Sequence, residues 1–263
     1  MSASSAGKEY MKKYPVFLLY CLICAAAFGG ANGDGTVRFT GESFKRHMQG
    51  LAAAADRIYW SHTDRLAVTD TAGSYIKLVE ADHHHGDICI NGGKLYAAVN
   101  KGKFNRESGA ENFVYVYDLD LNLLEVVPID FMPQGLGAIE FFDGSFYLGG
   151  GALKDAKTFK IYKCSKDFKL EKIFEIPAYD SELGVQTICS CGGFFWFGCY
   201  MRSGKEFLWK LDKNLRVLGR FNNFAALGIS RMPAESDRLI IGRTKKGESG
   251  LFDTAEISRL EPK

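Results

Sequence analysis

Histidine and acidic side chains gather in one short part of the chain. All five histidines lie between His47 and His85, and Asp87 follows two residues later. Imidazole nitrogens with a nearby carboxylate form a suitable ligand set for a divalent metal ion. The same groups also serve as general acids and bases. His62, His84 and Asp87 are therefore the candidate metal ligands of this sequence.

The histidine triplet limits how such a site can form. In an extended strand alternate side chains point to opposite sides, so His83 and His85 point one way and His84 the other. At most two of the three imidazoles can then bind one ion. The alternative is that one histidine satisfies buried backbone groups while the others are solvated. Both interpretations stay open at this point.

The segments that carry these residues are repeated β-hairpins. The clearest is 83–99, where an apolar strand, the turn Gly92–Gly93 and a second strand follow one another. Gly-Gly or Asp-Gly between apolar runs is a strong hairpin signal. Four further segments have the same outline, namely Met48–Trp60, Gln134–Gly149, Gly184–Gly198 and Gly228–Gly242. Their expected turns are Asp56–Arg57, Asp143–Gly144, Gly192–Gly193 and Ser236–Asp237.

A second strand pair follows the first four hairpins, as in Phe113–Asp118 with Leu123–Val127. Four antiparallel strands in each repeat of roughly 40 to 50 residues are typical of a β-propeller blade. The five repeats predict an all-β, five-bladed propeller. The last repeat has only a third strand, Glu256–Leu260, whereas an unpaired strand, Thr36–Thr40, precedes the first hairpin. We expect Thr36–Thr40 to complete the last blade and remove an exposed sheet edge.

The propeller fold indicates where a site would lie. First strands line the central channel, and the residues that start first strands or end second strands converge on one face. Asp87 is the strongest single candidate there, because a carboxylate on an inner strand is costly unless it is paired or bound. Arg231 either binds the ligand with it or is only its salt-bridge partner. The ligand-binding residues expected at this channel mouth are His84, His85, Asp87, Gln186, Tyr200, Arg202 and Arg231.

Two further features bear on this site. The loop Lys101–Asn112 is long, polar and on the same face, so it forms one wall of a pocket or is only a solvated loop. Glu140 is the one acid in the corresponding strands of the other blades, and we predict that it points away from the channel.

The chain contains no zinc-protease, serine-hydrolase, dinucleotide or phosphate-loop motif.

The strand pattern resembles the blades of secreted bacterial β-propellers of the lactonase and quinoprotein-like group. The likeness is clearest in segments 113–127 (FVYVYDLDLNLLEVV) and 207–221 (FLWKLDKNLRVLGRF), and it covers Val37–Leu260 at the level of strand pattern. This resemblance implies a fold and not a reaction.

The first 33 residues have the pattern of a cleaved secretory signal. Met11–Lys13 is basic, Val16–Phe28 is apolar and small residues follow, with Met11 as an alternative start. A membrane anchor and a buried helix are the alternatives, but the apolar run is short for a membrane span. We expect 34–263 to be a single secreted or periplasmic domain without stable membrane insertion.

Composition agrees with one globular domain. The chain has 263 residues, of which 46% are hydrophobic, and a net charge of +2. This length is sufficient for one sizeable core. Nucleic-acid binding is not indicated, because no clustered basic face is evident. The five cysteines after the signal are an odd number, and we expect buried, inert thiols.

Three functions fit these observations, in this order. The first is a secreted propeller that binds a small polar ligand, such as a sugar or glycan, at the channel mouth. The second is a propeller hydrolase or lyase, in which histidines and Asp87 hold a divalent metal, the only cofactor that the sequence suggests. The third is a scaffold whose rim binds a protein partner.

Overall fold

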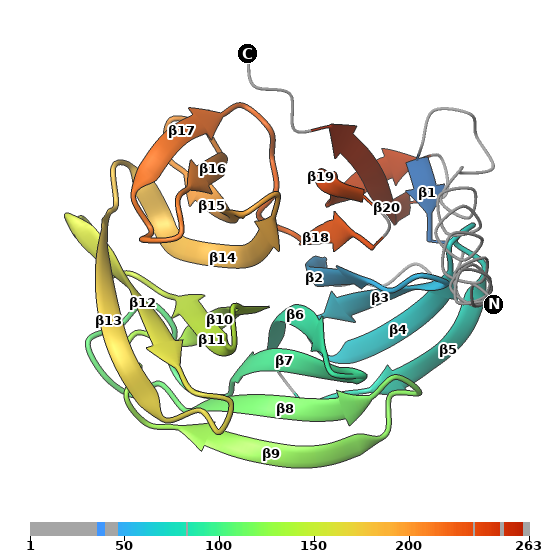
Figure 1. Cartoon of the computed structure of the whole chain (residues 1–263), viewed down its shortest axis with the longest axis horizontal. Coiled ribbons are helices and arrows are strands. Elements are labelled where there is room, and N and C mark those ends of the chain that lie inside the picture. The colour runs from blue at the N-terminus through green and yellow to red at the C-terminus, as the bar shows by residue number, and fades with distance from the viewer. Residues whose placement is uncertain (1–35, 40–46, 83, 234, 248–249, 260–263) are drawn as a thin grey trace, which may run out of the picture.

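A ring of five four-stranded antiparallel sheets forms the described part of the chain (Figure 1). The computed structural model describes residues 36–39, 47–82, 84–233, 235–247 and 250–259, without the side chains of 235–236, 246–247, 250–252 and 257–259. The predicted signal sequence 1–33 lies outside these residues. The prediction of an all-β, five-bladed propeller is confirmed.

Four blades use strands that are consecutive in the chain. In each of them the first strand contacts the first strands of neighbouring blades and the fourth lies outermost. The first blade contains β2 (Met48–Ala53), β3 (Arg57–His62), β4 (Arg65–Asp70) and β5 (Tyr75–Glu80), and the second contains β6 (His85–Asn91), β7 (Lys94–Asn100), β8 (Asn112–Asp118) and β9 (Leu123–Ile129). The third blade contains β10 (Leu136–Phe142), β11 (Ser145–Gly150), β12 (Thr158–Cys164) and β13 (Leu170–Pro177). The fourth blade contains β14 (Ser181–Cys191), β15 (Phe194–Met201), β16 (Leu208–Leu211) and β17 (Val217–Phe221).

The fifth blade joins the two ends of the chain. It contains β18 (Ile229–Met232), β19 (Glu235–Gly247) and β20 (Gly250–Arg259), and β1 (Thr36–Arg38) pairs with β20 as the outermost strand. Val37 lies opposite Ala255, and Val37 is buried. The expected closing strand is therefore present over its described part, while Thr40 lies outside the described residues.

The glycine-bearing turns have the expected conformation. Gly92 and Gly93 have φ values of 57° and 75°, and Asp143 and Gly144 have 48° and 80°. Positive φ at both central residues defines the type I′ turn, whose twist matches that of the flanking strands. The turn expected at Ser236–Asp237 is wrong, because both residues lie inside β19 and the hairpin turns between Met232 and Glu235.

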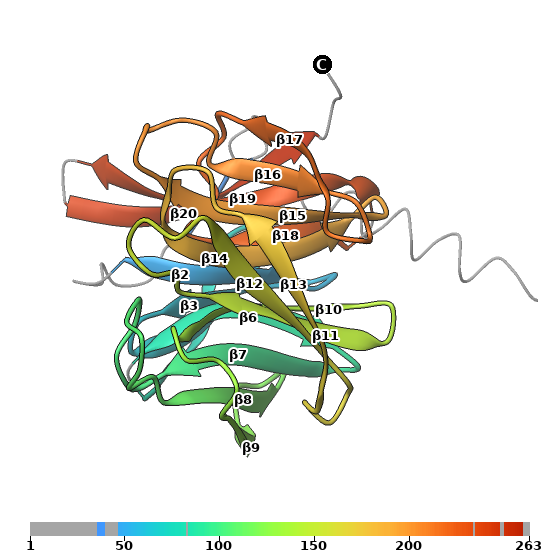
Figure 2. The ribbon, with the colours of Figure 1, turned by 90° about the vertical axis from the view of Figure 1, so that its left-hand side faces the viewer.

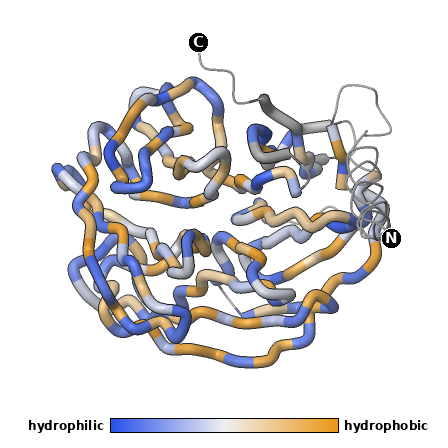
Figure 3. Tube along the Cα trace, in the orientation of Figure 1, coloured by the Kyte–Doolittle hydropathy of each residue, from blue (hydrophilic) through white to orange (hydrophobic). Residues whose placement is uncertain are grey.

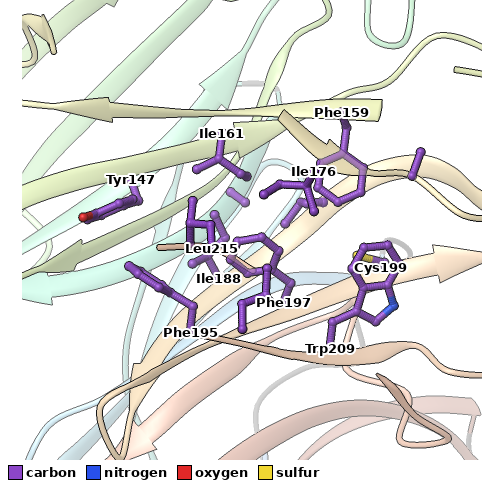
Figure 4. Close-up of a cluster of buried hydrophobic side chains, with 14 of the residues drawn as sticks. Tyr147, Phe159, Ile161, Ile176, Ile188, Phe195, Phe197, Cys199, Trp209 and Leu215 are labelled. Carbon is purple, nitrogen blue, oxygen red and sulfur yellow. The ribbon is translucent and has the colours of Figure 1, made fainter. Parts of the chain in front are cut away.

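Apolar faces of neighbouring sheets pack against each other. Between the third and fourth blades the ring of Tyr147 lies 4.6 Å from that of Phe195, and Phe159 lies 5.5 Å from Trp209 (Figure 4). Burying each such side chain stabilises the fold by about 1.5 to 3 kcal/mol. Figure 2 shows the same ring from the side, turned by 90° from the view of Figure 1. Apolar residues also occur on the outer strand β9, where Leu124 is exposed (Figure 3).

Glycines let the inner strands approach each other closely at the centre. A Cβ atom on Gly50 would lie 2.7 Å from the Cα of Asp87, and one on Gly86 would lie 2.6 Å from the carbonyl oxygen of Gly137. Any larger residue would force β2, β6 and β10 apart. The channel is therefore narrow where the predicted site residues begin.

Candidate functional site

Four inner strands carry a β-bulge at the same position of the repeat. The pairing register shifts between Met48 and Gly50, between His85 and Ile88, between Leu136 and Ala138, and between Val185 and Thr187. The extra residues are Gln49, Gly86 with Asp87, Gly137 and Gln186. A bulge bends the strand and re-aims its side chain. Here it turns the two glutamine side chains toward one end of the channel.

These bulges surround a pocket of about 490 Å³, which we call the mouth pocket. Its size lies in the range of small-molecule sites. Of the predicted ligand-binding residues, His84, Gln186 and Tyr200 line it. The remaining lining residues are His47, Gln49, Gly86, Asn100, Lys101, Gly102, Phe104, Leu136, Gly137 and Leu183.

Two histidines meet one glutamine on the wall of the mouth pocket. The side-chain nitrogen of Gln49 lies 3.0 Å from Nε2 of His47 and 3.3 Å from Nε2 of His84. An amide nitrogen only donates, so with the amide in this orientation both ring nitrogens accept and each neutral imidazole carries its proton on Nδ1. Burial lowers the pKa of His47, with the nearby His62 adding to the effect and Asp253 opposing it. His47 is therefore neutral at neutral pH, and its imidazole contributes a polar group to the wall of the mouth pocket.

The loop Lys101–Asn112 forms one wall of this pocket. Of the two alternatives for the loop, a pocket wall or a solvated loop, the first is therefore the one observed. Its start is held by Asn100, whose side-chain oxygen Oδ1 accepts hydrogen bonds from the backbone nitrogens of Gly102 and Glu111 at 2.9 and 3.2 Å. Phe104 of the loop packs over Gly135, which has a φ of 102°. The sequence predicts this loop but not Phe104 as a pocket residue, because the only signal of Phe104 is an aromatic residue in a polar segment.

Asp87 does not line the mouth pocket. Its side chain is completely buried, and one carboxyl oxygen accepts hydrogen bonds from the backbone nitrogens of Ile188 at 2.9 Å and Ile139 at 3.4 Å. Burial raises the pKa of Asp87 well above its usual range, against the effect of these bonds. Asp87 therefore connects the inner strands of three blades, which is a different role from the expected ligand contact.

His85 is also buried and does not line the mouth pocket. Its Nδ1 lies 2.5 Å from the carbonyl oxygen of Asp82, and its Nε2 lies 2.8 Å from the hydroxyl of Tyr117. A carbonyl only accepts, so Nδ1 carries the proton and Nε2 accepts from Tyr117. Burial lowers the pKa of His85 to about 4. His85 is thus a hydrogen-bonded core residue between strands.

The two predicted arginines lie elsewhere. Arg202 is exposed and pairs with Asp155 at 2.7 Å, outside the mouth pocket. Arg231 lines a second pocket, formed by later residues of the inner strands. Arg231 therefore does not join Asp87 at the channel mouth, because the hairpin of its blade turns earlier than predicted.

The three candidate metal ligands do not form one group. Nε2 of the buried His62 lies 2.7 Å from Oδ2 of Asp253, whereas His84 faces the mouth pocket and Asp87 lies in the channel. Among the described side chains, no three from histidine, cysteine, aspartate and glutamate lie close enough to hold a metal ion. Metal binding stays a prediction.

The second pocket contains Glu140, for which the predicted orientation is wrong. Glu140 lines it instead of pointing away from the channel. The bulge at Gly137 adds one residue to β10, so side chains after it lie on the opposite side from that expected by simple alternation. The cysteines behave as expected, since Cys89, Cys164, Cys189, Cys191 and Cys199 are all buried free thiols.

Comparison with known proteins identifies the fold and no narrower group. No protein-family model and no curated protein matches the chain. A solved structure of Myxococcus xanthus glutaminyl cyclase is similar, with a TM-score of 0.58, 12% identity, and coverage of 85% of this chain and 95% of that chain. A chain of a nidogen/laminin complex has a TM-score of 0.50 and 12% identity, covering 74% of this chain and 72% of that chain. At such identity the likeness shows the β-propeller fold alone.

The described ranges of the chain also contain no helix that is long and apolar enough to span a membrane.

Proposed function

We propose that this protein binds a small, neutral polar ligand, such as a sugar or the end of a glycan, in the mouth pocket. The observation that carries the proposal is the convergence of Gln49, His84 and Gln186 on one pocket of about 490 Å³. Amides and neutral imidazoles offer both donors and acceptors to hydroxyl groups. Small-molecule sites typically combine a few such polar groups with apolar and aromatic walls.

Charge and shape favour a neutral ligand. The lining residues include no carboxylate, and the one lysine, Lys101, pairs with Asp82 at 2.6 Å. Phe104 and Tyr200 supply aromatic surface on the pocket wall. An aromatic ring can pack against the apolar face of a sugar while the polar groups bond its hydroxyls. Three different blades contribute these side chains, so the folded propeller organises the site before the ligand arrives.

The proposal includes export of the protein. The apolar run Val16–Phe28, preceded by lysines and followed by small residues, supports removal of a secretory signal. Outside the cytoplasm, an exported protein can meet free sugars and glycans.

Binding can be tested directly with neutral monosaccharides and disaccharides. We expect at least one of them to raise the melting temperature of the purified protein and to bind in calorimetry. Gln186→Ala removes a pocket amide and should weaken that binding about tenfold, the value of one lost hydrogen bond. Asn214→Ala is the matched control, because Asn214 is exposed in the turn between β16 and β17.

The outcomes separate the three functions. If no saccharide binds, or if Gln186→Ala binds as well as the wild type, the sugar proposal is wrong. A stoichiometric metal ion would instead favour the hydrolase or lyase. A protein partner whose binding is lost on changes at the rim, with the mouth pocket intact, would favour the scaffold.

A further inference from the structure

A second pocket, which we call the far pocket, lies further along the inner strands. The mouth pocket is lined by early residues of β6 and β14, such as Gly86 and Gln186, and the far pocket by later ones, such as Cys89 and Cys189. Three residues of strand correspond to about 10 Å, so the two pockets face different ends of the channel. The far pocket has a volume of about 220 Å³, enough for a molecule of a few heavy atoms.

Glu140 is the acidic group of the far pocket. Its side chain is 8% exposed, and Oε1 accepts a hydrogen bond from the hydroxyl of Ser190 at 2.5 Å. Burial raises the pKa of Glu140 to about 7, while Ser190 and Arg231 oppose the shift. No basic side chain among the described residues forms an ion pair with Glu140. A buried carboxylate of this kind gains most from a cation that enters the pocket.

Arg231 is the basic group at the rim of the same pocket. It is exposed, and its guanidinium makes no hydrogen bond or ion pair with any residue that the structure describes. Its charge reaches Glu140, although the two groups form no direct ion pair within the described residues. A purely structural pair would place the two charges in contact. Here an acid in the pocket wall and a base at the entrance are held apart.

The far pocket combines apolar side chains with polar groups. Ile88, Ile229 and Ala52 line the pocket, together with the hydroxyl of Ser230 and the thiols of Cys89 and Cys189. Burial raises the pKa of both thiols well above its usual range, so they are neutral here. A ligand for this pocket therefore carries a positive group for Glu140, a negative group for Arg231 and a short apolar side chain that packs against these residues.

We propose that the far pocket binds a small zwitterion, namely a free α-amino acid with a short apolar side chain. Its ammonium group bonds the carboxylate of Glu140, and its carboxylate bonds the guanidinium of Arg231. A bidentate arginine–carboxylate contact fixes the orientation of the ligand. The apolar walls limit the size of its side chain. This second site is independent of the mouth pocket.

L-Alanine is the probe for this proposal, used with the purified protein in calorimetry at pH 8, where Glu140 is mostly ionised. We expect L-alanine to bind to a single class of sites in this titration. L-Alaninamide lacks the carboxylate and propionate lacks the ammonium group, so each should bind much more weakly. Glu140→Gln and Arg231→Gln should each weaken L-alanine binding by about 30-fold or more, because each removes a charged partner.

Matched controls make the same chemical changes elsewhere. Glu175→Gln on the outer strand β13 and Arg216→Gln beside the turn before β17 alter exposed residues. Both should leave the affinity unchanged, and melting curves of all variants check folding. Arg231 is exposed, so its substitution tests the proposal even if Glu140→Gln unfolds the protein.

Three results would overturn the proposal. They are absence of L-alanine binding, equal binding of L-alanine and propionate, and wild-type affinity in the folded Glu140→Gln or Arg231→Gln variant. Saccharide binding in the mouth pocket should be the same in wild type and Arg231→Gln, so failure of one proposal does not imply failure of the other.

Discussion

The carboxylate of Asp87 accepts a hydrogen bond from the backbone nitrogen of Ile188 at 2.9 Å. The same oxygen accepts a second, longer bond from Ile139, so a side chain on β6 reaches the inner strands β10 and β14. Inner strands are sheet edges, and their N–H groups must find a partner when water has little access. Asp87 provides that partner at the centre of the ring.

We therefore predict that Asp87 stabilises the fold. Asp87→Ala should lower the free energy of unfolding by about 2 to 4 kcal/mol, because two buried N–H groups lose their acceptor. Asp87→Asn should cost less than about 1 kcal/mol, because its amide oxygen can still accept and the raised pKa of Asp87 favours a neutral side chain. Chemical denaturation measures both. A fully stable Asp87→Ala variant that has lost ligand binding would instead restore Asp87 to the binding site.

Glu140 should make stability depend on pH. Burial raises its pKa from 4.5 to about 7 in the folded protein. The folded state then holds a proton that the unfolded state has already released, so this contribution is full below pH 4.5 and is lost as the pH rises through 7. Over that window it amounts to about 3 kcal/mol. The groups that act on Glu140 are Ser190, Arg231, Asp87 and the two pocket thiols.

Glu140→Gln isolates this effect. The difference in unfolding free energy between wild type and Glu140→Gln should change between pH 4.5 and pH 8, in the direction that disfavours the wild type at high pH. Glu175→Gln is the control and should show no such change. A pH-independent difference for Glu140→Gln would show that the carboxyl of Glu140 titrates normally.

His62 and Asp253 should hold the closing blade to the first blade. Nε2 of His62 lies 2.7 Å from the carboxylate, and both side chains are almost fully buried. The other oxygen of Asp253 accepts from the hydroxyl of Thr244 at 2.5 Å. Removing one partner of a buried pair typically costs about 3 to 5 kcal/mol. His62→Ala should therefore destabilise the protein by that order and speed hydrogen exchange in β1 and β20.

An exposed pair provides the comparison. Arg57 lies 3.0 Å from Asp120 in the neighbouring blade, with both side chains accessible to water. Arg57→Gln should cost less than about 1 kcal/mol. If the two substitutions cost the same, His62 and Asp253 do not have a special role in ring closure.

The metal prediction has its own measurement. Binding of a divalent ion by His84 or a neighbouring histidine predicts a stoichiometric metal in the purified protein and a fall in melting temperature on addition of a chelator. The sugar proposal predicts saccharide binding that a chelator leaves unchanged. His84→Ala should abolish the metal content in the first case. In the second case it should weaken saccharide binding about tenfold, since it removes one hydrogen-bonding group.

The architecture of this protein follows from local patterns in its sequence. Turn residues such as Gly92–Gly93 and the period of strand pairs specify four-stranded units, and the leftover strand at Thr36 specifies how the ring closes. These signals involve only a few neighbouring residues, so they can be read from the sequence without knowing the rest of the fold. The same pattern also predicted Gln186 at the channel mouth, and Gln186 lines the mouth pocket.

Tertiary structure decided the direction of individual side chains. A bulge adds one residue without a clear sequence signal, and this reversed the predicted orientation of Glu140. The last hairpin turns between Met232 and Glu235, so Arg231 belongs near the end of its strand and faces the far pocket. Contacts with Tyr117 and Asp82 hold His85 in the core, and His84 is the histidine of the two that lines the mouth pocket. Such contacts join strands that fold together only in the complete ring, so the sequence alone determined the ring and its closure, and packing decided which polar groups face the pockets.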